Sequence, residues 1–561
     1  MAISLEKRRL ATAKLRVIPL GGQEEIGKNM MVFEYGDDIV VVDCGLMFPE
    51  ESMLGIDLVI PDITYLEEHR RKVRGIIITH GHEDHTGALP YVLARLPVPI
   101  YATRLTRGLI EVKLQEHKLH DKTELITIKV GGRVPFGALT CEFFHQCHSI
   151  PDAIGVIVHT PVGVLVHTGD YKLDQTPVDG QPPDYARLAQ LGKQGVLALF
   201  GDSTRADTPG YTPSERVIDA AFDRVFAQAE GRIIVASFAS LISRIQQVID
   251  AAVRHHRLVA VVGRSMINNV SMAIDLGYLR VPENVLLRID EVLKLPDEHV
   301  CIVTTGSQGE PSSALTRMAN GDQRHVTIKP GDTVVISATP IPGNEELVGR
   351  NIDNLFKLGA NVIYDRHEQI HVSGHGAQDE LKLMLSLLRP RFLVPAHGQY
   401  RHLIWHKRLG EQMGIPAENI VLAENGSVIE FTATTVTMAS RVPAGYVFVD
   451  GASVGEIGDV VLRDRQVLAQ DGILLVALTV DRETGRFIAG PDIVSRGFVH
   501  VRSSDALIAR ARAVVSDTIA LDGENPGGYS QTKGRIKDAL SRFFYEETRR
   551  RPMILPVVLE A

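Results

Sequence analysis

The stretch RGIIITHGHEDHTGALPYV, residues Arg74–Val92, places three histidines and two acids within six residues, His80 to His85. The β-branched apolar run before them predicts a buried strand, and the residues after them favour a helix. Neutral imidazoles and a carboxylate that converge at a strand end are ligands that a divalent cation prefers. A polar surface loop with chance histidines is the alternative. Burying such a cluster without a cation would be costly, so the block predicts a metal site.

The composition is that of an ordinary globular protein and places limits on its function. The 561 residues suggest three or four domains. The net charge of −8 gives no global attraction for nucleic acid, so a polyanionic substrate would need local basic patches or bound metal. No signal-peptide core and no membrane-span-length apolar run occurs. The four cysteines form no CxxC pair, and we expect a reducing, cytoplasmic setting without membrane association.

The pattern of predicted elements changes along the chain. Roughly the first 200 residues alternate short apolar runs with turn signals, which is typical of a strand-rich fold. From about Thr212, strands alternate with helices, which favours a parallel α/β sheet. From about Ala444 a separate segment begins, which ends with a basic helix and a short strand.

Further candidate ligands also stand at the ends of predicted strands. CEFFHQCHS offers His145 and His148, VLVHTGDY offers Asp170, VPAHGQ offers His397 and VVVDCG offers Asp43. Each alone is most often a turn or capping residue. Together with the first block they form an ordered series along the chain.

This series resembles that of the metallo-β-lactamase superfamily. The α/β segment between Asp170 and His397 resembles the insertion of the beta-CASP subgroup, whose members are nucleases. The markers of that subgroup are matched by Asp202 in FGDSTRAD, His375 in HVSGHG and His397 in PAHG. GGQEEIGKNM, DCGLMFPEESMLGIDLVIPD, TTGSQGEP, ATPIPGNE and the trailing domain are similar to the ribonuclease J family over essentially the whole chain. Gln399 departs from the pattern, because related sequences often carry Glu there.

The resemblance implies an αββα sandwich of two sheets with helices on both outer faces, an inserted α/β beta-CASP domain and a small C-terminal α+β domain. The expected boundaries are residues 1–210 and 371–445 for the two parts of the sandwich, 211–370 for the insertion, 446–465 for a linker and 466–561 for the C-terminal domain.

The resemblance also implies two divalent metal ions per chain, with Zn²⁺ favoured and Mn²⁺ or Mg²⁺ as alternatives. One ion would be held by His80, His82 and His148. The second would be held by Asp84, His85 and His397, with Asp170 bridging the two. Asp43 would lie behind the ligands and orient one of them.

The implied activity is hydrolysis of RNA phosphodiester bonds in RNA maturation and decay. Such enzymes degrade RNA from the 5′ end, prefer a 5′-monophosphate and also cut internally. His375 would be the general acid, oriented by Asp202, while Asp84 would share in catalysis. The alternative for His375 is a loop histidine in a glycine-rich turn.

A terminal phosphate would need hydroxyls, backbone N–H groups and an arginine. Ser237, Ser240, Arg264 and Ser373 are the candidates, with helix capping or a solvated surface as the alternative for each. The expected partners are RNA, further copies of the chain in a homodimer or homotetramer through the terminal domain, and other RNA-decay proteins. The basic helix at Lys533–Arg551 could contact RNA, although a solvated face is the simpler interpretation.

Two other function classes stay open from the sequence. A small-molecule metallo-hydrolase of the same superfamily would lack the insertion between Asp170 and His397. A catalytically inactive RNA-binding or scaffold subunit would have lost metal ligands, and this sequence retains the full series.

Overall fold

The computed structural model describes residues 14–341, 343–365, 368–482, 487–498, 505–520 and 529–561. The chain packs into two compact units. The larger unit comprises Met1–Phe48 with Leu58–Val447, and the smaller comprises Pro49–Asp57 with Phe448–Ala561. The five-part division expected from the sequence stays a prediction.

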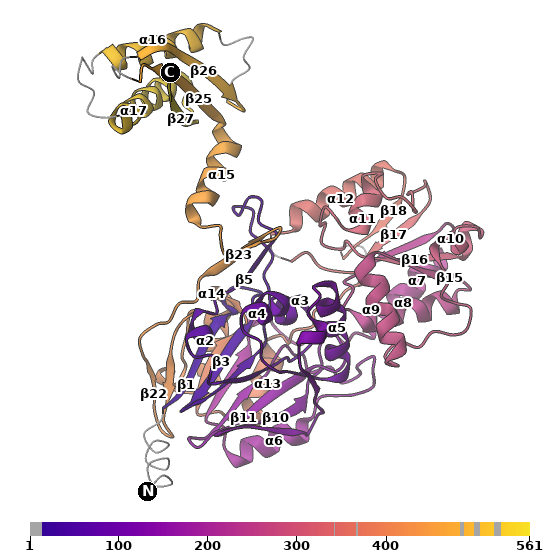
Figure 1. The fold of residues 1–561 in the computed structure, drawn as a ribbon. Coiled ribbons are helices and arrows are strands. Elements are labelled where there is room, and N and C mark those ends of the chain that lie inside the picture. The colour runs from indigo at the N-terminus through magenta and orange to yellow at the C-terminus, as the bar shows by residue number, and fades with distance from the viewer. Residues whose placement is uncertain (1–13, 342, 366–367, 483–486, 499–504, 521–528) are drawn as a thin grey trace. The chain divides into compact units, whose positions relative to one another are not determined.

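The larger unit is built on two mixed sheets (Figure 1). The first contains, in spatial order, β22 (Val436–Met438), β21 (Ile429–Phe431), β1 (Leu15–Gly21), β3 (Met30–Tyr35), β4 (Asp38–Val42), β6 (Val73–Ile77), β7 (Ile100–Ala102) and β8 (Leu125–Thr127). The second contains β19 (Phe392–Ala396), β13 (Ala198–Asp202), β12 (Val164–His167), β11 (Ile154–His159), β10 (Leu139–His145) and β9 (Arg133–Phe136). The short strands β2 (Gln23–Glu24) and β20 (Gly398–Gln399) pair in parallel, and β5 (Leu58–Pro61) precedes the first helices.

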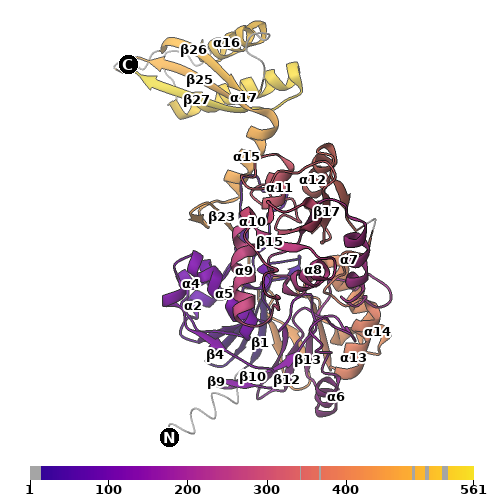
Figure 2. The same cartoon turned by 90° about the vertical axis from the view of Figure 1, so that its right-hand side faces the viewer.

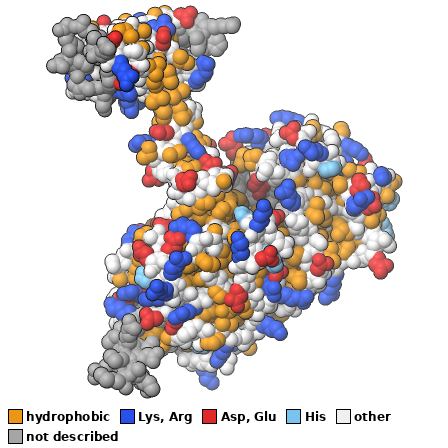
Figure 3. Space-filling model, in the orientation of Figure 1, with side chains coloured by type: hydrophobic (Ala, Val, Ile, Leu, Met, Phe, Trp, Pro, Cys, Tyr) orange, Lys and Arg blue, Asp and Glu red, His pale blue; other side chains and the backbone are white. Residues whose placement is uncertain are grey.

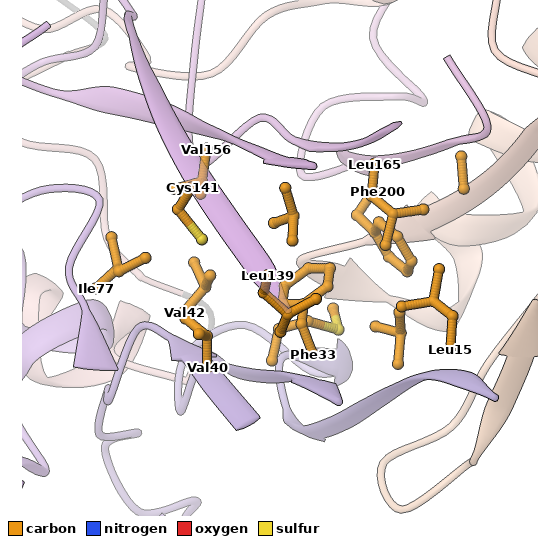
Figure 4. Close-up of a cluster of buried hydrophobic side chains, with 14 of the residues drawn as sticks. Leu15, Phe33, Val40, Val42, Ile77, Leu139, Cys141, Val156, Leu165 and Phe200 are labelled. Atoms are coloured by element: carbon orange, nitrogen blue, oxygen red, sulfur yellow. The ribbon is translucent and has the colours of Figure 1, made fainter. Parts of the chain in front are cut away.

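The two sheets face each other across one apolar core (Figure 4). Side chains from both sheets, among them Val42 and Ile77 from the first and Cys141 and Val156 from the second, are buried there. Phe33 meets Phe200 edge to face across the core, with ring centroids 5.6 Å apart. Each inward-facing apolar strand residue removes area from water, and this burial stabilises the sandwich.

Helices cover the outer faces of both sheets. The first sheet is flanked by α2 (Thr64–Glu68), α4 (Leu89–Arg95) and α5 (Arg104–Glu116), while the short α3 (Glu83–Thr86) lies at the end of β6 and the 3₁₀ turn η1 (His120–Lys122) follows α5 in the chain. The second is flanked by α6 (Tyr185–Gln194), α13 (Gln378–Leu388), α14 (Tyr400–Gln412) and η3 (Ala417–Asn419), and α6 and α13 share an apolar cluster with its outer face. The expected αββα sandwich is confirmed.

The insertion is an all-parallel sheet with helices on both faces, as expected (Figure 2). Its strand order is β15 (Leu258–Val262), β16 (Val300–Thr304), β14 (Ile233–Ala236), β17 (Thr333–Ile336) and β18 (Asn361–Ile363). One face packs on α7 (Val217–Gln228), α8 (Ile242–Arg254) and α9 (Arg264–Asp275). The other packs on α10 (Ile289–Val292), α11 (Ala314–Ala319) and α12 (Glu345–Lys357), and η2 (Asp297–His299) precedes β16.

Glu380 joins three segments where the chain returns from the insertion to the sandwich. Its fully buried carboxylate accepts backbone N–H groups from Leu173 at 2.7 Å, Thr212 at 2.7 Å and Ala377 at 2.8 Å. Thr212 in turn donates its hydroxyl to the carbonyl of His375 at 2.7 Å. A carboxylate with three backbone donors makes strong, charge-assisted hydrogen bonds. These bonds fix the segments next to Asp170 and His375.

The smaller unit has the expected α+β character. Its sheet has the order β26 (Phe487–Arg496), β25 (Ile473–Val480) and β27 (Met553–Glu560). One face of this sheet packs on α16 (Asp505–Ala520) and α17 (Tyr529–Thr548). β23 (Tyr446–Asp450), β24 (Ser453–Val454) and α15 (Asp459–Asp471) precede the sheet in the chain. Of the helices in the described ranges, none has the length and apolar character to span a membrane.

Candidate active site

The site begins at the carboxyl end of β6, in the middle of the first sheet. The strand pairs in parallel with β4 and β7, so the residues after Ile77 emerge at a buried sheet edge. The chain bends at Gly81 and His82, and His82, with φ −71° and ψ 157°, is the residue directly before α3. The short helix then turns Asp84 and His85 back toward the strand end. The local sequence thus gathers its ligands by a short bend followed directly by a helical turn.

Residues far apart in the chain meet at this point and form two neighbouring groups. In each group, one possible ligand atom from every residue lies within 4.8 Å of the others. The first group is His80, His82 and His148, and the second is Asp84, His85, Asp170 and His397. His375 adjoins both, because it also groups with His148 and Asp170 and with Asp202 and His397. His145, the other histidine of CEFFHQCHS, instead bonds the carbonyl of Gln181 at 2.9 Å.

Most of these imidazoles are oriented by a hydrogen bond from Nδ1 to an acceptor outside the group. The acceptors are Thr79 Oγ1 for His80 at 3.1 Å, Asp43 Oδ2 for His85 at 2.8 Å, Gly374 O for His148 at 2.8 Å and Asn29 Oδ1 for His397 at 2.7 Å. The carbonyl and carboxylate oxygens only accept, and the Thr79 hydroxyl donates its own proton to Asp43, so the ring proton sits on Nδ1 in each case and Nε2 turns inward. Asp43 thus lies behind His85, with Oδ2 at 2.8 Å from its Nδ1. Metal-binding histidines commonly have such outer partners.

The inward nitrogens of the first group lie close together. His82 Nδ1 is 3.0 Å from His80 Nε2 and 3.1 Å from His148 Nε2. A neutral His82 carries one ring proton and can satisfy at most one of these neighbours, so lone pairs face each other. Nitrogen ligands of tetrahedral zinc lie about 3.3 Å apart. The residues present therefore fit a divalent cation.

The second group fits a cation for a different reason. His397 Nε2 is buried and has no hydrogen-bond partner among the described residues. It lies 3.5 Å from Asp170 Oδ2 and 3.9 Å from Asp84 Oδ2, and His85 Nε2 lies 3.2 Å from the same Asp170 oxygen. A lone pair held beside carboxylate oxygens is repulsive unless a positive charge lies between them. Two imidazoles with two carboxylates are a usual donor set for Zn²⁺ or Mn²⁺.

Burial and charge prepare the ligand atoms for a cation. Burial lowers the pKa of His82 to about 4, and it lowers the pKa values of His80 and His148 well below their ordinary value. These rings are therefore neutral near pH 7. Burial alone would raise the pKa of Asp170, but the neighbouring His397 and His85 outweigh it and hold the pKa well below its usual range. Asp170 therefore stays ionised.

His375 and Asp202 form a pair at the rim of the two groups. His375 Nδ1 lies 2.7 Å from Asp202 Oδ2, and the His375 side chain is 19% exposed. Burial lowers the pKa of His375, but the carboxylates of Asp202 and Asp170 outweigh it and raise the pKa to about 9. Asp202 Oδ1 in turn accepts two hydrogen bonds from Thr204, from the backbone N–H at 2.9 Å and from the side-chain hydroxyl at 2.8 Å. The pair can thus present a proton on His375 Nε2.

A close backbone approach links His375 to the first group. A Cβ on Gly374 would lie 2.4 Å from His148 Cε1, so glycine is required for its carbonyl to reach the His148 ring.

Two site residues have strained backbones. His397 has φ +51° and Asp43 has φ +66°, in the left-handed region that residues with side chains rarely adopt. Backbone strain of this kind gathers at functional sites.

The four candidates for a terminal phosphate lie in different surroundings. Ser237 follows β14, is buried, and its hydroxyl has no hydrogen-bond partner in the described parts of the chain. Ser240 is half-buried, and Arg264 is exposed at the first position of α9. Ser373 Oγ accepts the backbone N–H of His375 at 3.1 Å, so it also shapes the His375 loop.

Sequence reasoning missed several residues that orient the ligands. Thr79, Gly374 and Asn29 each bond a histidine of the two groups. Thr79 and Gly374 directly precede His80 and His375, so their position next to predicted site residues was an available signal. Asn29 belongs to GGQEEIGKNM, which the sequence singled out without assigning a role to any of its residues.

Comparison with known proteins gives matches along most of the chain. Four families match: "Metallo-beta-lactamase superfamily" at residues 25–182, "Ribonuclease J, beta-CASP domain" at 230–355, "Zn-dependent metallo-hydrolase RNA specificity domain" at 360–421 and "Ribonuclease J C-terminal domain" at 460–561. A solved structure of a protein of unknown function from Enterococcus faecalis V583 matches with a TM-score of 0.52 at 16% identity, over 74% of this chain and 100% of that one. This last likeness shows the fold alone.

Curated relatives match over nearly the full length. Ribonuclease J2 of Bacillus subtilis is 44% identical over 98% of this chain and 99% of its own. Ribonuclease J of Thermus thermophilus is 44% identical over 97% of this chain and 95% of its own. With the family matches and the two ligand groups, these relatives confirm the resemblance: the chain belongs to the ribonuclease J family of the metallo-β-lactamase superfamily.

Proposed function

We propose that this protein, a metal-dependent ribonuclease, degrades RNA from the 5′ end, prefers 5′-monophosphate ends and also cuts internally, in RNA maturation and decay. The observation that carries the proposal is the His375–Asp202 pair, at 2.7 Å, directly beside the two ligand groups. Its position allows a proton to be delivered at the same place where a phosphodiester would meet the metals.

The two groups would hold two divalent ions, with Zn²⁺ favoured by the histidine-rich donor sets. His80, His82 and His148 would hold one ion, and Asp84, His85 and His397 the other, with Asp170 between them. When bound, such ions supply an activated water nucleophile and neutralise the negative charge that develops on the phosphate. The chain's own contribution is to fix the ligands through Asp43, Thr79, Asn29 and the Gly374 carbonyl.

His375 is the proposed general acid for the leaving 3′-oxygen. A catalytic acid must be within hydrogen-bond reach of the leaving atom and must hold its proton until transfer. Asp202 accepts from His375 Nδ1 and so turns Nε2, which lies 3.9 Å from Asp170 Oδ2, toward the ligand groups. Asp202 acts as the orienting carboxylate.

Unpartnered buried polar atoms support a phosphate pocket where the insertion meets the sandwich. Within the described ranges, Ser237 Oγ, His371 Nδ1 and Arg205 Nε have no hydrogen-bond partner. Burial, followed by the nearby charges of Arg244, Lys172 and Arg205, lowers the pKa of His371 to about 3. Glu215 pairs with both Arg244 and Lys172, so Arg205, whose Nε is unpartnered in the described ranges, is the cation offered to a phosphate. Hydroxyls and cations of this kind suit a terminal monophosphate. Ser240, Arg264 and Ser373 are the remaining proposed contacts.

The other two function classes are less well supported. The insertion and the family of RNA-specificity domains matched at residues 360–421 disfavour a small-molecule hydrolase. An inactive scaffold is disfavoured because the ligand groups and the His375–Asp202 pair are complete.

The surface charge gives no broad basic patch on the face seen in Figure 3, where basic and acidic side chains are interspersed. Attraction of RNA would therefore depend on the site itself more than on the general surface.

We also propose that the chain forms a homodimer, or a homotetramer built from two such dimers, through the outer face of the β25–β27 sheet. That face carries apolar side chains in register: Leu475 pairs with Val494 on one side and with Leu555 on the other. Val494 is 48% exposed and Leu555 47% exposed, although the opposite face is covered by α16 and α17. Contiguous exposed apolar side chains of this kind mark interaction sites.

The His375→Ala variant is expected to lose RNA cleavage by at least about 100-fold, the lower bound for a general acid, while it keeps the metal content of the wild type. His375 is proposed as a proton donor and not as a ligand, so activity and metal content should separate. Single-turnover cleavage and elemental analysis of the same preparation measure both. His145→Ala, which removes a nearby histidine outside both groups, serves as the control. Loss of metal together with activity would contradict the assigned role.

Ser237→Ala is expected to slow exonuclease turnover of 5′-monophosphate RNA much more than internal cutting of a circular RNA. Each charge-assisted contact contributes about 1.5–3 kcal/mol, so losing one should weaken terminal capture roughly tenfold or more. Ser373→Ala should lower both rates, because Ser373 also holds the His375 backbone. RNA with a 5′-triphosphate is the substrate control. An unchanged ratio of the two rates in Ser237→Ala would place the terminal pocket elsewhere.

The double change Val494→Glu with Leu555→Glu is expected to convert the assembly to monomers, because neighbouring charges on an apolar interface are costly to bury. Sedimentation velocity of the full chain measures the change. Val253→Glu, a similar substitution at an exposed apolar position of α8, should leave the assembly as in the wild type. Monomeric wild type, or an unaltered assembly in the double variant, would count against this interface.

A further inference from the structure

Asn29 lies where three segments of the larger unit meet. It directly precedes β3 and is 8% exposed. On one side of it runs the turn of Asp84 and His85, and on the other the loop after β19 that carries His397. Its amide is engaged by residues of the second group, with Nδ2 at 3.1 Å from Asp84 O and 3.2 Å from His85 Nε2, and Oδ1 at 2.7 Å from His397 Nδ1, so it orients ligands and is not placed as a ligand itself.

The hydrogen bonds of Asn29 define how its amide group is turned. Nδ2 donates to the carbonyl of Asp84 at 3.1 Å, and that carbonyl can only accept. Oδ1 must then be the atom that faces His397 Nδ1, at 2.7 Å across 368 residues of sequence. His397 consequently donates from Nδ1 and turns its unprotonated Nε2 into the second group.

The main chain reinforces this link. The Asn29 N–H donates to the same Asp84 carbonyl at 3.0 Å, and Gly45 donates to the Asn29 carbonyl at 2.9 Å. Asp84 is thereby tied to Asn29 by both a backbone and a side-chain bond. Asn29 is thus the fixed point between the Asp84 turn and His397.

The orientation of the His397 imidazole needs a side-chain partner, because the backbone contacts of this strained residue do not determine it. Its φ is +51°, and its carbonyl is held by Ser203 N at 3.3 Å and Thr204 Oγ1 at 3.1 Å. These bonds hold the main chain but leave the imidazole free to turn about its side-chain torsions. The bond to Asn29 selects the ring orientation in which Nε2 is 3.5 Å from Asp170 Oδ2.

We propose that Asn29 is a positioning residue that holds His397 and the Asp84 turn in register and thereby sets the metal affinity of the second group. The inference rests on the proposed two-metal function. Among the described residues, Asn29 has no hydrogen bond to His80, His82 or His148, so the effect should be selective for the second group.

Metal titration of Asn29→Ala and Asn29→Leu tests this. Metal-free protein is dialysed against graded Zn²⁺ or Co²⁺, and bound metal is counted by elemental analysis. Outer partners of metal ligands typically contribute 10–100-fold in affinity. We expect the second ion to bind about 10–100-fold more weakly in both variants, while the first binds as in the wild type. With Co²⁺, visible absorption reports the loss of one ligand environment independently of activity.

Asn425→Ala is the matched control. Asn425 also ties down the N-terminal loop with two bonds, to Gln23 N at 3.1 Å and to Glu25 Oε1 at 2.8 Å, but it contacts no ligand. It should bind both ions as in the wild type, and the leucine variant, which is close to asparagine in size, controls for cavity formation.

Several results would overturn the inference: wild-type affinity for both ions in the variants, equal weakening of both ions, or failure of both variants to fold, which would show that Asn29 supports the whole unit. Fewer than two ions in the wild type itself would instead contradict the proposed function. The two failures are therefore distinguishable.

Discussion

The repulsion among inward-facing ligand atoms is the constraint on which the rest of the site depends. Nε2 of His80 and of His148 both lie about 3 Å from Nδ1 of His82, and Nε2 of His397 faces carboxylate oxygens without a donor. In a buried site such contacts are unfavourable unless positive charge lies among them. The outer hydrogen bonds prevent the rings from turning away. The fold therefore holds a donor arrangement that cations stabilise.

The same buried framework that holds the ligands also positions the proposed acid. Glu380 ties the segment after Asp170 to the segment after His375 through backbone bonds. A buried ion chain runs alongside: Lys172 contacts Glu215 at 3.1 Å, and Glu215 contacts Arg244 at 2.7 Å. Arg244, on the helix after the Ser237 loop, also bonds the carbonyl of Ile370 at 2.8 Å. The loop that carries Ser237, a proposed contact of the 5′-phosphate, is thus joined to the His375 segment by buried charged groups. Separating these charges would cost free energy.

Much of the fold and of the ligand set could be predicted from the sequence, because both follow local rules. A polar residue within a few positions of the end of an apolar strand emerges at a sheet edge, and this rule predicts His80, Asp170 and His397. The residues that orient the ligands could not be found in this way. Asn29 and the Gly374 carbonyl act through contacts with chain segments hundreds of residues away, and a backbone carbonyl carries no sequence signal. Ser373 shows the same limit, since its bond to the His375 backbone appears only in three dimensions.

The most direct test of this account is the metal content of active enzyme. Purified protein should contain two divalent ions per chain by elemental analysis. A chelator should remove both ions and abolish RNA hydrolysis, and Zn²⁺ or Mn²⁺ should restore it. Restored metal should also raise the free energy of unfolding, by about 2.7 kcal/mol for each ion whose free concentration is one hundred times its dissociation constant. Fully active protein without stoichiometric divalent metal would contradict the account.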